Sequence, residues 1–422
     1  MEENIKKNKR KINLLLLYQA LSCDWLFIYA IDSIFLNEIK GLSFSTISLT
    51  ITILSLSYIL IQLPLVKLVR KIGTTTASRI GTACYLLSAV LFIFNTWTIF
   101  LSFVVFAIGM AFKTPSDSKI LKDNLKMYGM SNSYAKYCGR IKFLYQILSA
   151  SSCLAAGYLY QVWAYAPIVC CCVIMVVAMI LSLFVRNEKE LYKKQNNLPA
   201  HQVQMEKFEY FKLFKYHTTW LLIGFSALFS ALVSCNMDIN KMTFQEIGIS
   251  AITITIINAI IRALRAFSTL GFEGIYKKFG FNTTYFVLTM LAVGVIMVGL
   301  GGTFLSGIAA IIVMSIGSVF IYAARDPFNI IREDFVMNSK GLTKRQTLLS
   351  LTNMGRYLGR LIFSLAVSGL LLSQTAAVTG MILCACMVPP LIVLSILLDR
   401  KRRINKYSVS YTHLTLPTNR EV

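Results

Sequence analysis

The sequence predicts an all-α integral membrane protein with twelve transmembrane helices, arranged as two parallel six-helix repeats. Three observations carry this prediction: the composition, the alternation of charge between apolar blocks, and a set of motif pairs roughly 207 residues apart. The chain has 422 residues, of which 56% are hydrophobic and 14% charged, and its mean hydropathy is +0.64. A soluble domain carries about 25% charged residues, so this chain is too apolar to be soluble.

Twelve apolar blocks are each long enough to cross a bilayer, whose hydrocarbon core of about 30 Å takes about 20 helical residues. The blocks cover residues 12–36, 44–66, 77–96, 98–118, 140–160, 163–185, 218–237, 249–270, 282–301, 304–324, 346–371 and 376–398. The predicted domains are a first six-helix half at 1–185, a cytoplasmic central loop at 186–217, a second six-helix half at 218–400 and a cytoplasmic tail at 401–422. In the tail, residues 409–422 read either as translated sequencing-adapter sequence or as an ordinary short tail.

Basic residues alternate between the connections of these blocks. The connections after even-numbered blocks are basic, as in RKIG at 70–73 and the polar stretch 186–217. The connections on the other side are short and hold Lys40 and Lys241. Because positive charge is retained on the cytoplasmic side, we expect both termini in the cytoplasm and the protein in the plasma membrane. The net charge of +23 then reflects membrane orientation, and we expect no nucleic-acid binding.

Short motifs recur in the same order in the two halves. The pairs are Asp32 and Asp238, Gly41 and Gly248, Gly73 and Gly280, Lys113 of KTP and Arg325 of RDP, and Arg140 of YCGR and Arg360 of YLGR. The first four pairs are separated by about 206 to 212 residues and the last by 220, a difference that we attribute to insertions in the cytoplasmic loops. This pattern predicts parallel repeats related by an axis along the membrane normal.

The connection after the second block, VKLVRKIGTT at 66–75, is similar to a loop motif of the major facilitator superfamily. In that family the motif has a glycine, an aspartate, a basic residue, a second glycine and a trailing basic pair. Lys71 and Gly73 match it. The departures, in order, are Val66 for the first glycine, Arg70 for the aspartate, and Thr74 and Thr75 for the basic pair.

The resemblance to the major facilitator superfamily covers about residues 10–400 and includes the six-plus-six topology and the central loop. GMAFKTPSDSKILKDNL followed by YCGR, and RQTLLSL at 345–351, resemble bacterial members of uncharacterised specificity. The resemblance implies the MFS fold and transport by alternating access.

Ionisable side chains inside the blocks are candidates for function, since a charge at the centre of a membrane helix costs about 2.5–3.5 kcal/mol. Asp24 lies near the midplane of the first block and is the candidate proton carrier; the alternative is a structural carboxylate satisfied by a neighbouring helix. Asp32 lies nearer the outer rim and has a repeat partner in Asp238. We interpret these two as gating residues, with wet interfacial carboxylates as the alternative.

Polar side chains also form stripes at helical spacing. The stripes are Asn258, Arg262 and Arg265; Ser55, Tyr58 and Gln62; and Ser315, Ser318, Tyr322 and Arg325. Arg262 is deep, and we interpret it as the counter-charge to an acid of the first block or as an anchor for a substrate anion; the alternative is an arginine that extends to the cytoplasmic phosphates. The predicted substrate and proton pathway comprises Asp24, Asp32, Tyr58, Gln62, Asn258, Arg262 and Tyr322.

A candidate cytoplasmic gate follows from basic residues and glycines near the predicted inner ends. In the superfamily, spans 5 and 11 meet spans 8 and 2 of the opposite half when the inside closes. We therefore expect Arg140 and Arg360 to sit at the inner rim and to bond across the interface; packing glycines beside arginines that reach the lipid phosphates are the alternative. The predicted gate comprises Arg70, Gly73, Lys113, Arg140, Gly280, Arg325 and Arg360.

No enzyme signature appears in the sequence, and we expect no enzyme activity, cofactor or metal. The sequence predicts a monomeric secondary transporter in the lipid bilayer whose partners are a small organic molecule and protons. Export is favoured over import only by the frequency of exporters in the family, because FVVFAIGMAFK lacks the span-4 arginine and LSASSCLAAGYL the span-5 proline of drug exporters. A non-transporting receptor or scaffold on the same fold is the alternative.

Overall fold

The computed structural model describes residues 2–130, 134–187, 190, 217–279, 282–337 and 342–414. Over these residues the chain forms 13 α-helices, one π-helical segment and no strand. The first set is α1 (Glu2–Leu21), α2 (Ile28–Ile34), η1 (Phe35–Ile39), α3 (Phe44–Ile72), α4 (Thr74–Leu91), α5 (Thr96–Met127), α6 (Tyr134–Val162) and α7 (Ala166–Phe184). The second set is α10 (His217–Glu246), α11 (Ala251–Phe279), α12 (Thr283–Phe304), α13 (Gly307–Met337), α14 (Leu342–Leu370) and α15 (Ala376–Leu414).

Every predicted apolar block coincides with a long helix, except that the first block is divided between α1, α2 and η1. Seven of the described helices are long and apolar enough to cross a membrane: α3, α5, α7, α10, α12, α13 and α15. The more polar helices include α6, α11 and α14, which pack against the opposite set and carry polar side chains there. The count of twelve spans and the cytoplasmic termini stay predictions.

The first block is broken where its polar residues lie. Helix α1 ends at Leu21, and α2 begins at Ile28. In the break, the Ser22 hydroxyl donates to the Tyr18 carbonyl at 2.6 Å, and the Trp25 backbone N–H donates to Asp24 Oδ1 at 2.8 Å. Short polar side chains that bond the backbone in this way compete with helical hydrogen bonds, which explains why the helix stops at this point.

Two predicted inner ends were placed too early. Pro115 and Pro327 lie inside helices, because α5 continues to Met127 and α13 to Met337. Lys113 and Arg325, which were expected near the inner ends, therefore lie about 14 and 12 residues from the ends of their helices, or roughly 20 Å at 1.5 Å per residue.

The predicted outer connection at 236–248 is also mostly helical, since α10 runs to Glu246. Lys241 was expected on the surface of this connection. It is instead 3% exposed, and its neighbours from Asn236 to Phe244 are also largely buried. Charged and polar residues near the end of a helix had the composition of a loop, but here they are covered by the other set of helices.

The helix lengths repeat between the two sets. Helices α3 and α11 each have 29 residues and begin 207 residues apart, and α6 and α14 each have 29 residues and begin 208 apart. Gly41 and Gly248, which follow the equivalent helices η1 and α10, both adopt positive φ, at 64° and 75°. Glycine adopts this conformation without the penalty that a Cβ imposes.

The YCGR and YLGR motifs are not equivalent, and the prediction that they match is wrong. Arg140 lies six residues past the start of α6, whereas Arg360 lies 18 residues past the start of α14. At the helix offset of 208, the counterpart of Arg360 is Ser152, three turns deeper than Arg140. No loop insertion separates the two halves by 220 residues at this point, so the shared letters are out of register.

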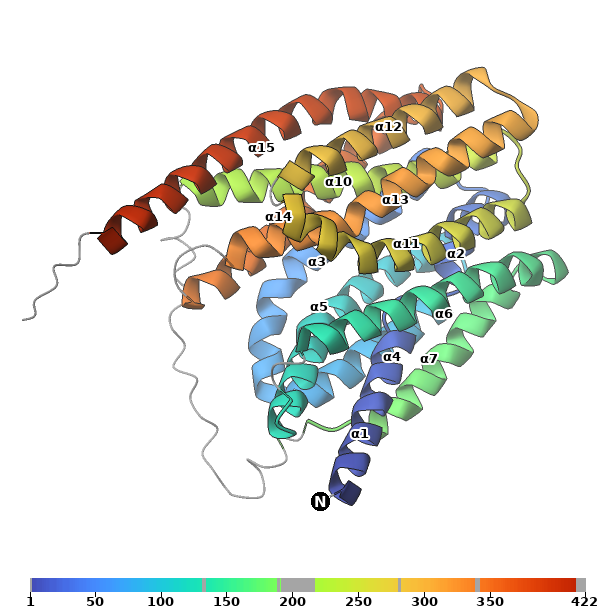
Figure 1. The fold of residues 1–422 in the computed structure, drawn as a ribbon. Helices are drawn as coiled ribbons and strands as arrows, with labels where there is room; N and C mark the ends of the chain where they lie inside the picture. Colours follow the sequence, from blue (N-terminus) through green and yellow to red (C-terminus); the bar gives the residue numbers. More distant parts are fainter. Residues whose placement is uncertain are drawn as a thin grey trace, which may run out of the picture.

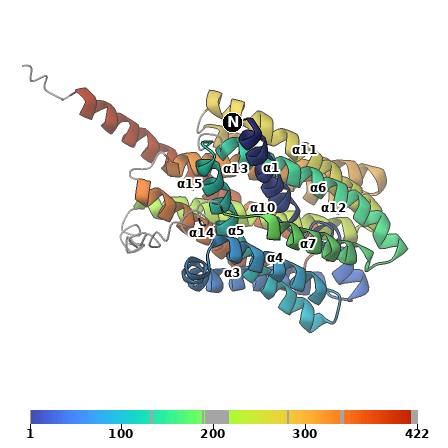
Figure 2. The same ribbon diagram turned by 90° about the horizontal axis from the view of Figure 1, so that it is seen from below.

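Helices α1–α7 pack mainly among themselves, as do α10–α15, and the main contacts between the sets are α3 with α14 and α6 with α11. Figure 1 shows α6 and α11 side by side along the middle of the bundle. Figure 2 shows the last part of α15 projecting beyond the other helices. Short connections make successive helices antiparallel, so the start of α1 and the end of α3 share one side, which we name the terminal side. The start of α3 and the end of α14 lie on the opposite, distal side.

Candidate functional site

The two sets of helices are joined on the distal side. The Ser45 hydroxyl near the start of α3 donates to the Ser368 carbonyl near the end of α14 at 2.7 Å. Gly157 of α6 meets Thr255 of α11 so closely that a Cβ on residue 157 would overlap the threonine hydroxyl. The distal side is therefore closed in this conformation.

Solvent nevertheless reaches the middle of the bundle at the break in the first block. Cys23 is exposed and Asp24 is half-buried, although both stand about halfway along the first span. The Tyr145 hydroxyl of α6 donates to Asp24 Oδ2 at 3.4 Å. The charges of Arg262 and Arg325 also act on the Asp24 carboxyl from the second set of helices. Asp24 thus lies where the two sets face each other, as the sequence predicted for a pathway residue.

Arg262 of α11 points its guanidinium at the first set of helices. It is 6% exposed, donates from Nη1 to the Ser149 hydroxyl of α6, and lies with Cζ 4.7 Å from the centre of the Tyr29 ring. Its Nε has no hydrogen-bond partner. The arginine is therefore a deep cation between the two sets of helices, and it does not extend to the terminal side.

Arg325 of α13 is half-buried and close enough to Asp24 for their charges to interact. Among the residues that the structure describes, its one hydrogen-bond partner is the Met237 sulfur, at 4.0 Å. A thioether is a weak acceptor. Arg325 thus offers most of its N–H donors to the centre of the bundle.

Asp32 and Lys241 form an ion pair between the two sets of helices near the distal side. Lys241 Nζ donates to Asp32 Oδ1 and to the Tyr29 carbonyl, each at 2.8 Å, and lies 3.9 Å from the centre of the Tyr29 ring. The Tyr29 ring therefore contacts two cations of the second set, Lys241 and Arg262. Lys241 was missed as a site residue; its spacing of three residues from Asp238 on a helix was the available signal.

Asp238 and Arg360 form a second ion pair, at 3.1 Å, within the second set of helices. Arg360 was predicted to lie at the inner rim and to bond across the interface. It lies instead past the middle of α14, and the acceptor that it contacts is on α10 of its own set. The expected acceptor was sought across the interface because the helix was given too short an inner portion.

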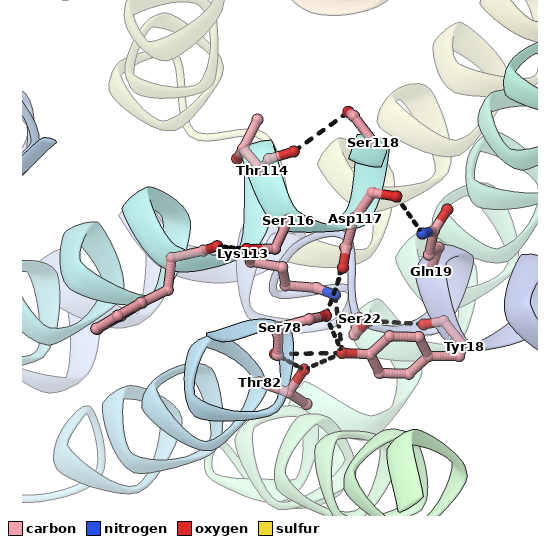
Figure 3. Close-up of polar contacts among 11 residues, drawn as sticks. Tyr18, Gln19, Ser22, Ser78, Thr82, Lys113, Thr114, Ser116, Asp117 and Ser118 are labelled. Atoms are coloured by element: carbon pink, nitrogen blue, oxygen red, sulfur yellow. Dashed lines mark hydrogen bonds and ion pairs between the residues drawn. The ribbon is translucent and has the colours of Figure 1, made fainter. Parts of the chain in front are cut away.

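A third ion pair lies inside the first set of helices (Figure 3). Lys113 Nζ contacts Asp117 Oδ2 at 2.6 Å and donates to the Tyr18 hydroxyl at 3.3 Å. The Tyr18 hydroxyl is also 2.7 Å from the Ser78 hydroxyl and 2.8 Å from that of Thr82. The cluster ties α1, α4 and α5 together. Lys113 is 3% exposed, so the prediction of a rim residue there is wrong.

The loop between α3 and α4 is anchored by the segment after α7. Gly73 has φ +86° and joins the two helices, as its place in the loop motif suggests. The Glu190 carboxylate accepts from the Thr74 backbone N–H at 2.9 Å, from the Thr74 hydroxyl at 2.6 Å and from the Thr75 hydroxyl at 3.1 Å. The two threonines that replace the basic pair of the motif thus bind an acid, which the motif comparison did not indicate.

The other predicted pathway residues lie along the facing helices. Tyr58 of α3 is 5% exposed and stacks on Tyr357 of α14, with ring centroids 4.0 Å apart. Tyr322 and Asn258 are buried, and the Gln62 side-chain oxygen is buried without a partner. The remaining gate residue with a described side chain, Arg140, is exposed and lies over the Tyr137 ring at 5.3 Å. Gly280 and the Arg70 side chain lie outside the part of the chain that the structure describes.

A model of the family described as the Major Facilitator Superfamily matches residues 15–364, which is most of the chain. The chain belongs to the Major Facilitator Superfamily. No curated protein matches it.

Solved structures with the superfamily fold cover nearly the whole chain. A nucleoside transporter NupG mutant (D323A) has a TM-score of 0.72 at 13% identity, over 93% of this chain and 99% of that one. A POT family transporter in complex with a thioalcohol-conjugated peptide has 0.70 at 10%, over 92% and 96%. A D-xylose–proton symporter has 0.64 at 13%, over 89% and 95%. At these identities the likeness shows the fold.

Proposed function

We propose that this member of the superfamily is a secondary active transporter that moves a small organic molecule by alternating access. The observation that carries the proposal is a set of charges at the centre of the bundle, Asp24 on one side and Arg262 and Arg325 on the other. These groups are costly to hold there, and solvent reaches them at Cys23 while the distal side is closed. The family and the names of the similar structures support transport over catalysis.

In this proposal the protein has twelve spans, and the terminal side faces the cytoplasm. The conformation described is then open to the cytoplasm and closed to the outside. The distal contacts Ser45–Ser368 and Asp32–Lys241 act as the outer gate. Arg140, Arg70 and the Gly73 and Gly280 loops belong to the inner gate, which closes when the outer gate opens.

Asp24 is the proposed proton carrier. It is a half-buried carboxylate at a helix break and has a tyrosine hydroxyl and a backbone N–H as its neighbours. Opening to one side or the other would change which charges it faces, and hence its tendency to hold a proton. We propose export as the direction, with proton uptake from outside driving it.

The test is transport by the full-length protein reconstituted in proteoliposomes with an imposed pH gradient and a panel of labelled metabolites and drugs. Asp24→Asn should lose gradient-driven accumulation while keeping counterflow of the substrate, and Asp24→Glu should keep both. An Asp24→Asn protein that accumulates substrate with an unchanged pH profile would refute the coupling role. If wild-type protein transports no compound and Cys23 never changes its reactivity toward a membrane-impermeant maleimide, the proposal of a transporter fails.

A further inference from the structure

The central charges of the bundle do not cancel. Three acid–base pairs are matched within hydrogen-bond distance: Asp32 with Lys241, Lys113 with Asp117, and Asp238 with Arg360. The groups left acting on one another across the centre are Asp24, Arg262 and Arg325. Two positive charges and one negative charge leave an excess of one positive charge. An excess charge at the middle of a membrane protein is costly unless a ligand of opposite sign compensates it.

Both arginines have donors to spare. A guanidinium carries five N–H donors in a planar fork. Arg262 is 6% exposed, so water cannot readily satisfy it, yet its Nε has no acceptor. Arg325 has the weak Met237 sulfur as its one partner in the described chain. A buried donor without an acceptor costs about 1–3 kcal/mol, so these two residues are poised for an acceptor that the protein does not supply.

Asp24 is not that acceptor in this conformation. Its oxygens accept from the Trp25 N–H and the Tyr145 hydroxyl, both from the first set of helices. No ion pair within 4.0 Å joins it to Arg262 or Arg325, although all three side chains are described. The opposed charges are thus held apart across the centre of the bundle, and the arginine side of the centre is left open to a ligand.

We infer, on the basis of the transport function proposed above, that the substrate is an organic anion, and that Arg325 together with Arg262 binds its carboxylate-like group. A planar oxyanion with two acceptor oxygens matches the guanidinium fork and forms charge-assisted hydrogen bonds, which are stronger than neutral ones. Binding one negative charge would neutralise the centre while Asp24 is ionised. A cationic substrate would add to the positive excess, and a neutral one would leave it in place.

The experiment uses purified full-length protein in detergent and measures thermal unfolding with aliphatic and aromatic carboxylates, each compared with the primary amide and the amine of the same carbon skeleton. Carboxylates of a suitable skeleton should raise the unfolding temperature, and their amides and amines should not. Arg325→Gln should weaken this carboxylate binding at least tenfold, and Arg325→Lys should retain part of it. The control Lys119→Gln removes a positive charge from an exposed position of α5 and should leave binding unchanged.

Stabilisation by amines or amides but by no carboxylate would overturn the inference, and so would carboxylate binding that survives in Arg325→Gln. A zwitterion control, the matching α-amino acid, separates the remaining case: if it binds and the simple carboxylate does not, the substrate is zwitterionic. The transport proposal is judged separately, by whether the maleimide reactivity of Cys23 changes when the outer gate is broken by Lys241→Met. If that reactivity changes and only amines bind, the transporter proposal stands and the anion inference falls.

Discussion

Lys241 of α10 and Asp32 of α2 join the two sets of helices through a 2.8 Å ion pair that is 3% exposed on the lysine side. The pair lies near the distal side, where Ser45 also bonds to Ser368. Because it links elements that must separate when the distal side opens, it favours the conformation described here. Its removal should act on the equilibrium between conformations more than on folding.

Lys241→Met should increase the population that is open on the distal side. Spin labels at residues 43 and 373, both exposed on that side, would report a longer distance by pulsed electron paramagnetic resonance in a cysteine-free background. Lys241→Arg keeps the charge and should keep the short distance. The double change Asp32→Lys with Lys241→Asp should restore it in part. Identical distance distributions in Lys241→Met and wild type would show that the ion pair does not bias the conformation.

Gly157→Ala should also open the distal side, for a steric reason. The new methyl group would overlap the Thr255 hydroxyl and approach Ile252 Cα to 3.3 Å, so α6 would have to move away from α11. Gly139, on the same helix, has nothing within 4 Å of its Cβ position, so Gly139→Ala is the matched control and should be silent. The same spin-label distance serves as the measurement. A shift in Gly139→Ala as large as in Gly157→Ala would contradict the steric explanation.

Arg360→Met should destabilise the protein strongly, because it leaves the 13%-exposed Asp238 carboxylate without its partner. Removing one member of a buried ion pair costs about 3 kcal/mol or more. The loss would be measured by denaturant unfolding in detergent. The double variant Asp238→Leu with Arg360→Met removes both charges and should recover most of the stability. If the double variant is as unstable as Arg360→Met alone, packing rather than charge explains the effect.

Glu190→Ala should loosen the first turn of α4. The carboxylate caps the Thr74 N–H and bonds two threonine hydroxyls, and losing a cap costs about 1 kcal/mol. Amide hydrogen exchange of residues 74–77 should then accelerate about fivefold. Glu190→Gln keeps an acceptor oxygen and should show a smaller acceleration. Unaltered exchange in Glu190→Ala would mean that other groups hold this helix start.

Much of the helix arrangement follows from the sequence, because long apolar runs and a repeat of about 207 residues are properties of local composition. The central placement of Asp24 and Arg262 could be predicted for the same reason, since depth along a helix is counted in residues. Helix ends could not be counted so well. Pro115 sits inside α5, and the polar run around Lys241 is helical, because contacts with other helices outweigh local preference.

Partners between distant residues were harder to predict. The acid that neutralises Lys241 comes from the other half of the chain, and the acid that binds Thr74 comes from the segment after α7. Neither is visible in a single sequence. The YxGR pair failed for a different reason: four shared letters say nothing of helical register, and the constant offset of the surrounding helices was the better guide.

The Asp32–Lys241 pair also bears on how the protein is made. The two residues are 209 positions apart, and at about 5–20 residues per second Lys241 is synthesised about 10–40 s after Asp32. Through that interval the broken first span has to stay in the bilayer with the first half alone. Trp25 supplies the means, since its ring contacts Phe92, Phe103 and Phe106 and its Nε1 donates to Ser88 Oγ at 3.1 Å. The aromatic cluster therefore acts as an early anchor during biogenesis, and the ionic lock between the halves forms only when the chain is more than half complete.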